Sequence, residues 1–140
     1  MTTIVEFLTA RYDEIEAAAR AAERSSSTAW THATSTSIEF GERFRGLALL
    51  LDERAGENHA SRQYEVTNHI ALHDPAHVLA DIASKRRILD RHCADGRYCA
   101  QCPTGTDNLP VVLLDECPEL CDLAAPFDQH PDYREQWRPS

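Results

Sequence analysis

The sequence has 140 residues, enough for one domain with a modest core, and its 23 acidic against 14 basic side chains give a formal net charge of −9. This negative field repels phosphate backbones and lowers the expectation of broad nucleic-acid binding. The start of the chain does not resemble a secretory signal, and the longest aliphatic run, residues 47–51, is too short to span a membrane. We therefore expect a single cytoplasmic domain over residues 1–140 with no membrane association.

Residues 1–24 are predicted to form a helix. Thr3 followed by Glu6 is typical of a capping box at a helix start. Apolar residues then recur at alternating spacings of three and four, as one helical stripe does: Val5, Leu8, Tyr12, Ile15, Ala19 and Ala22. Glu16 and Arg20 are placed for an i,i+4 ion pair on the other face. We expect the stripe to pack on the protein's own core, with a dimer seam as the alternative, so monomer and homodimer both stay open.

Residues 29–53 are predicted to form a small antiparallel sheet of two or three strands. Aromatic and β-branched residues stand there at even spacings, which favours strands over a helix: Trp30, Thr34, Ile38 and Phe40. The run from Leu47 to Leu51 has a helical turn as its alternative, because periodicity does not separate short apolar runs.

Residues 62–92 are predicted to form two consecutive helices. Asp74 is a favourable N-cap and Pro75 suits the first helical position, so the second helix should run from Pro75 to about His92. Its exposed side carries cations that complement the carbonyl end of the helix: Lys85, Arg86, Arg87 and Arg91. The alternative use of these cations is phosphate binding, which makes a nucleic-acid-associated regulator a second class of function.

Four of the five cysteines form two close pairs, C-x2-C at Cys99 and Cys102 and C-x3-C at Cys117 and Cys121. A C-x2-C turn presents two thiolates to one ion, and Cys117-Pro118 is typical of the start of a helix. An odd cysteine count in a reducing compartment weighs against disulfides. The spacing therefore predicts structural Zn²⁺ in a C-terminal lobe over residues 93–137, where the metal would order a segment with few large apolar residues.

The fourth ligand has three candidates. His92 closes the preceding helix, Cys93 stands beside it, and Cys121 lies one turn after Cys117.

His69, His73 and His77 recur every four residues, so an uninterrupted helix would align them as a second metal site. Asp74-Pro75 interrupts that helix, and the spacing lacks the general base of the zincin motif. Histidines with structural roles are the favoured interpretation. The alternative is a metal-dependent hydrolase that uses His69 and His73.

Two segments, HIALHDPAHVLADIASKRRILDRH and CPELCDLAAPFDQHPDYREQW, with the C-x2-C between them, resemble a family of small actinobacterial and actinobacteriophage proteins classified only as a domain of unknown function. The H-D-P, K-R-R-I-L and C-P…H-P-D-Y-R-x-x-W strings carry the resemblance. The resemblance implies an actinobacterial or phage origin, and it implies no biochemical mechanism. It also implies His92 as the fourth ligand beside Cys99, Cys102 and Cys117, because relatives usually have another residue in place of Cys121, which stays the alternative.

These observations combine into an α+β fold: an N-terminal helix, a small antiparallel sheet, two consecutive helices, and a zinc-stapled C-terminal lobe with a short helix. Tyr133 and Trp137, four residues apart, should dock the tail back on the domain as a short helix. The favoured function is a small zinc-stabilised accessory protein with an unknown protein partner, in the host cytoplasm if it is phage-encoded. Enzymatic activity stays open, and a non-enzymatic role is favoured.

Overall fold

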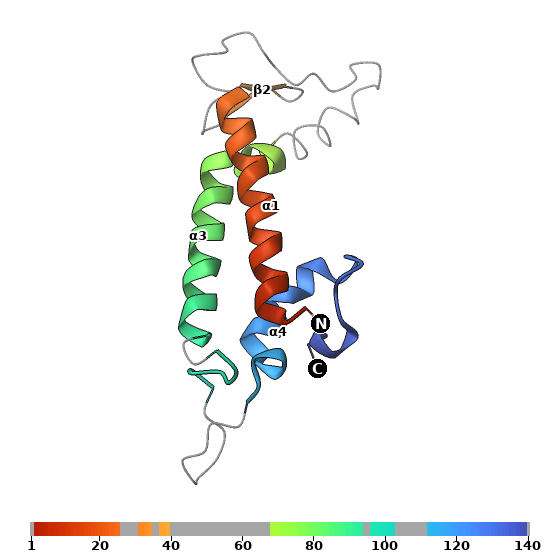
Figure 1. Cartoon of the computed structure of the whole chain (residues 1–140). Helices are drawn as coiled ribbons and strands as arrows, with labels where there is room; N and C mark the ends of the chain where they lie inside the picture. Colours follow the sequence, from red (N-terminus) through yellow and green to blue (C-terminus); the bar gives the residue numbers. More distant parts are fainter. Residues whose placement is uncertain are drawn as a thin grey trace. The chain divides into compact units, whose positions relative to one another are not determined.

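The computed structural model describes residues 2–25, 31–34, 37–39, 68–93, 96–102 and 112–139 (Figure 1). Its helices are α1 (Ile4–Ser25), α3 (Pro75–His92) and α4 (Pro118–Ala124), and residues 68–72 are also helical. Short 3₁₀ turns complete the C-terminal part: η2 (Leu114–Glu116), η3 (Ala125–Phe127) and η4 (Glu135–Trp137). The chain divides into two compact units, the first formed by Met1–Glu14 with Ile82–Ser140 and the second by Ile15–Asp81.

The described part of the chain is mostly helical, so the predicted α+β class is wrong. Its extended residues form one short antiparallel pair, β1 (Thr31–Thr34) with β2 (Ser37–Glu39). Two strands of this length make no sheet layer on which helices could pack. The β-branched residues of this stretch therefore indicated a hairpin and not a sheet. The rest of the predicted sheet over residues 29–53, and residues 62–67 of the predicted helix pair, lie outside the described residues.

The start of α1 is fixed by the predicted capping box, which the structure confirms. The Thr3 backbone N–H donates to Glu6 Oε2 at 2.8 Å, and the Glu6 backbone N–H donates to Thr3 Oγ1 at 3.2 Å. The bonds that Glu6 accepts hold the pKa of its carboxyl below its usual range. Within the first unit the buried side of the helix is wider than the predicted stripe and comprises Ile4, Phe7, Leu8, Arg11 and Tyr12.

The second unit contains two more predicted local contacts. Arg20 Nε donates to Glu16 Oε1 at 2.9 Å, which confirms the i,i+4 pair. The His77 backbone N–H donates to Asp74 Oδ1 at 2.7 Å, and α3 begins at Pro75. Asp74 therefore caps the helix as predicted.

An aromatic cluster forms the core of the first unit. The Trp137 side chain in η4 is fully buried, and its ring centroid lies 5.0 Å from that of Phe7. Phe7 also meets Phe127 and Tyr133 edge to face, at 6.2 and 6.0 Å. Such pairs contribute about 0.5–1.5 kcal/mol each beyond the burial of their area. Tyr133 and Trp137 dock the tail on Phe7 as predicted, but the helical part is only the three-residue η4 turn, and Tyr133 lies before it.

Arg11 is a charged residue buried beside this cluster. Its Nη2 donates to Glu14 Oε1 at 2.7 Å, its Nη1 contacts His130 Nε2, and its guanidinium carbon lies 5.4 Å from the centroid of Phe7. The carboxylate and the aromatic ring offset the cost of burying the charge. The H-P-D-Y-R-x-x-W string thus contributes His130 and its aromatic residues to the packing against α1.

Asp115 joins three segments of the first unit through one carboxylate. The Ile4 backbone N–H donates to its Oδ1 at 2.8 Å, and Gln136 Nε2 donates to its Oδ2 at 3.3 Å. Arg134 Nη1 lies 3.9 Å from the same Oδ2. An anion at the first amides of α1 also suits the helix dipole. Asp115 therefore holds the start of α1, the η2 turn and the C-terminal segment together.

Helices α1 and α3 are joined within the first unit by an ion pair, in which Arg86 Nη2 donates to Asp13 Oδ1 at 2.6 Å. Ile82 and Leu89 are buried side chains of α3. Among the described helices, none combines the length and the apolar character needed to cross a membrane.

We expect Asp115→Ala to lower the free energy of unfolding by about 1–3 kcal/mol, because it removes a helix-capping acceptor and a partner of the C-terminal segment. Urea denaturation at saturating zinc measures the change. Asp122→Ala, at an exposed position of α4, is the control and should change stability by less than about 0.5 kcal/mol. Equal losses in the two variants would contradict the connecting role of Asp115.

Candidate metal centre

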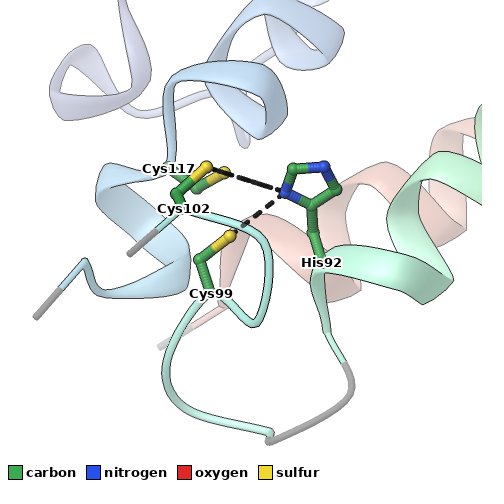
Figure 2. Close-up of side chains that lie close together, drawn as sticks. All are labelled: His92, Cys99, Cys102 and Cys117. Carbon is green, nitrogen blue, oxygen red and sulfur yellow. Dashed lines mark hydrogen bonds between the residues drawn. The ribbon is translucent and has the colours of Figure 1, made fainter. Parts of the chain in front are cut away.

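His92, Cys99, Cys102 and Cys117 lie together in the first unit (Figure 2). Their ligand atoms, the Nδ1 of the histidine and the three Sγ atoms, all lie within 4.8 Å of one another. We call this group the Cys3His cluster. It contains the three predicted cysteines with His92 as the fourth member, and it could hold a metal ion.

The distances within the Cys3His cluster match the size of a tetrahedral zinc site. His92 Nδ1 lies 3.1 Å from the sulfur of Cys99, 3.4 Å from that of Cys117 and 4.0 Å from that of Cys102. The sulfurs of Cys102 and Cys117 are 3.7 Å apart. Zn–S bonds of about 2.3 Å and Zn–N bonds of about 2.0–2.1 Å give tetrahedron edges of about 3.8 Å between sulfurs and about 3.6 Å between nitrogen and sulfur. The four measured distances scatter around these edges.

The end of α3 places His92 at the cluster. The helix continues to His92, and the Ala100 backbone N–H donates back to the His92 carbonyl at 3.0 Å. Gly96 has a φ of 74°, a conformation that residues with side chains rarely adopt, and its N–H donates to the Cys93 carbonyl at 3.0 Å. This turn reverses the chain so that Cys99 returns to the helix end.

A short backbone pairing brings Cys99 toward Cys117. The Cys99 N–H donates to the Val112 carbonyl at 2.9 Å, and the Leu114 N–H donates to the Arg97 carbonyl at 3.2 Å. Tyr98 and Leu113 form one antiparallel bridge between these bonds. The pairing of this segment is therefore a single bridge, and the η2 turn follows it directly.

The start of α4 presents Cys117 as predicted. Cys117 is the N-cap, Pro118 is the first helical residue, and the Cys121 N–H donates to the Cys117 carbonyl at 2.9 Å. Cys121 itself lies outside the Cys3His cluster, because its sulfur faces the Asp115 carbonyl oxygen at 3.8 Å. Cys93, the third candidate for the fourth position, also lies outside it.

Burial favours the protonated thiols of Cys102 and Cys117 by raising the pKa of each. Burial raises the pKa of Cys117 to about 11. Burial also raises the pKa of Cys102, and the hydrogen bond that this thiol donates to Glu119 acts in the same direction. A reactive cysteine needs a lowered pKa, so these thiols are poor nucleophiles. The chemistry that suits them is binding of a cation that displaces the thiol protons.

His69, His73 and His77, the residues of the predicted second metal site, lie outside the Cys3His cluster. The rings of His69, His73 and His77 are exposed and stack edge to face, with consecutive centroids 4.6 and 5.6 Å apart. Within the described ranges, the Cys3His cluster is the group in which three or more metal-binding side chains converge. The hydrolase interpretation therefore gains no support from the position of His69 and His73.

The cations of α3 are partly engaged within the protein. Arg86 pairs with Asp13, and Arg87 Nη2 donates to Ser84 Oγ at 2.7 Å. These contacts use part of the donor capacity of each guanidinium, which has five N–H groups. Nucleic-acid binding by this face stays a prediction.

Glu119 is a residue of the centre that the sequence analysis missed. Its Oε2 accepts a hydrogen bond from the Cys102 thiol at 2.9 Å and lies 3.6 Å from the Cys117 sulfur. The bond from Cys102 holds the pKa of the Glu119 carboxyl below its usual range. The available signal was its position, a carboxylate two residues after a candidate ligand at the start of a helix.

The fold and the cluster define a small, mainly helical protein with a candidate metal centre. Residues 1–139 match a family of unknown function (DUF6221), and the chain belongs to that family. This confirms the resemblance to a family of unknown function, while the actinobacterial and phage association stays a prediction. No curated protein and no solved structure matches the chain.

We expect one zinc ion per chain, measured by native mass spectrometry. His92→Ala and Cys99→Ser should lower zinc affinity by about 100-fold or more in a chelator competition, because each removes a ligand. Cys121→Ser removes a buried thiol outside the Cys3His cluster and should keep the ion. Loss of zinc in Cys121→Ser but not in His92→Ala would reverse the assignment of the fourth ligand.

Proposed function

We propose that the protein is a small accessory protein whose fold depends on structural zinc bound by the Cys3His cluster, and that it acts by binding another protein. The observation that carries the zinc assignment is the spacing of four ligand atoms close to the edges of a tetrahedron. Three of the four residues are also buried, His92, Cys99 and Cys117, so the centre lies inside the first unit.

Three thiolates and one imidazole favour zinc over magnesium and calcium, which prefer oxygen ligands. Four protein ligands also complete the tetrahedron, whereas catalytic zinc usually has three and keeps a position for water or substrate. This ligand count supports a structural ion.

The ligands come from three successive segments within residues 92–117: the end of α3, the turn over residues 96–102, and the N-cap of α4. A zinc ion would cross-link all three. Structural zinc binds isolated finger peptides with about 10–16 kcal/mol, comparable to the whole stability of a typical domain of about 5–15 kcal/mol. The metal is therefore a condition of folding for this part of the chain.

The proposed partner is a protein with a basic surface. The formal net charge of −9 attracts such a surface and repels phosphate backbones. The family resemblance supports a phage-encoded protein that acts on host machinery in the host cytoplasm.

Removal of zinc by a chelator is expected to lower the midpoint of thermal unfolding by more than about 15 °C, because several kcal/mol of binding energy are lost. Circular dichroism of the loaded and the metal-free protein measures this, and added Zn²⁺ but not Mg²⁺ should restore the midpoint. An unchanged midpoint in protein shown by mass to be metal-free would contradict the structural role.

The proposed partner class is tested by affinity capture of the zinc-loaded protein from untreated and nuclease-treated host lysate. We expect a partner that survives nuclease and is released as salt screens the charges. The control is the Cys99→Ser variant, in which the four-ligand zinc centre should not form. A partner lost on nuclease treatment would favour the nucleic-acid alternative.

A further inference from the structure

The members of the Cys3His cluster differ in burial. Cys117, Cys99 and His92 are only 0%, 2% and 6% exposed, whereas Cys102 is half-buried. Cys102 also has the longest separation from the histidine, 4.0 Å to Nδ1. Cys102 is therefore the least buried and least closely held member of the cluster.

An exposed carboxylate lies beside Cys102. Glu119 Oε2 lies 2.9 Å from the Cys102 sulfur and 3.6 Å from the Cys117 sulfur. Zinc binds carboxylate oxygen at about 2.0–2.2 Å, which gives oxygen-to-sulfur edges of about 3.5 Å in a tetrahedron. The oxygen thus lies about one coordination edge from the Cys117 sulfur and at hydrogen-bond distance from the Cys102 sulfur, just outside the Cys3His cluster itself. The backbone of Glu119 is held in the first turn of α4, because Cys117 is the N-cap of this helix and Pro118 is its first residue.

The contact between Cys102 and Glu119 places two alternative ligands side by side. The Glu119 oxygen and the Cys102 sulfur are 2.9 Å apart, so either group could fill the fourth position beside His92, Cys99 and Cys117. A carboxylate in place of a thiolate would keep four ligands and the same formal charge at the centre.

From this geometry we infer that Glu119 is a fifth donor of the metal centre and replaces Cys102 when that ligand leaves. The inference rests on the proposed zinc centre. In the exchange the bond from zinc to the Cys102 sulfur breaks, a bond to Glu119 oxygen forms, and the released thiolate takes a proton from water. His92, Cys99 and Cys117 hold the metal throughout, so the centre has one exchangeable position.

A double-mutant cycle in zinc affinity tests this assignment. Cys102→Ser should cost about tenfold less affinity than Cys99→Ser, because the Glu119 carboxylate lies 2.9 Å from the Cys102 sulfur and could replace that ligand. Glu119→Gln should change the wild-type affinity by less than about threefold but lower that of Cys102→Ser by about tenfold or more. Glu116→Gln makes the same charge change at an exposed position in η2 and is the matched control.

A second measurement does not depend on the folding of the ligand variants. In a Cys93→Ser/Cys121→Ser background, zinc-loaded protein is treated with iodoacetamide, whose carbon forms a bond to sulfur as iodide leaves. Cys102 should react first, as shown by peptide mapping. The singly modified protein should keep zinc in native mass spectrometry when Glu119 is present and lose it in Glu119→Gln.

The outcomes separate the two proposals. If Glu119→Gln and Glu116→Gln change the zinc affinity of the Cys102→Ser variant equally, the proposed role of Glu119 is overturned. The proposal of the zinc centre is not affected by that result. Tighter zinc binding in Glu119→Gln, without an effect in Cys102→Ser, would identify Glu119 as a repelling neighbour only. Wild-type protein that folds without zinc would overturn the zinc centre itself.

Discussion

Convergence of one imidazole and three thiols is the constraint on which the first unit depends. The turn over residues 96–102 buries no large apolar side chain among its described residues, and Cys99 is its buried member. Backbone pairing with residues 112–114 provides a few hydrogen bonds, each contributing about 1 kcal/mol. A shared ion is the interaction strong enough to hold this turn against α3 and α4.

The centre also influences the aromatic core through a short path of contacts. Cys117 ends the η2 turn, and this turn carries the Asp115 carboxylate that accepts from Ile4 and Gln136. Ile4 lies three residues before Phe7 in α1, and Gln136 directly precedes Trp137 in η4. The rings of Phe7 and Trp137 are the closest aromatic pair described in this core. The Cys3His cluster is therefore linked through η2 and Asp115 to the place where the C-terminal segment meets α1, and an ion bound by the cluster would favour closure of the core.

Local chemistry made much of the helical structure predictable. The Thr3–Glu6 capping box, the Asp74 N-cap and the Cys117-Pro118 helix start each depend on residues within one turn. The predicted α+β class failed because a short run of β-branched residues indicates local extension and no sheet layer, and the described part of this stretch contains one short strand pair. Among the cluster residues, spacing indicated three cysteines, but the choice of His92 needed the family resemblance. Arg11, Asp115 and Glu119 escaped prediction because their partners are set by the folded chain.

The contact between Ile4 and Asp115 spans 111 residues of sequence, and this separation governs the order of folding during synthesis. The first half of α1 emerges from the ribosome early, yet the side chains that cover Phe7 come from residues near Trp137. At roughly 5–20 residues per second, that apolar face waits on the order of ten seconds for its partners. The newly made helix is thus exposed to chaperones and to other nascent chains until the C-terminal segment arrives.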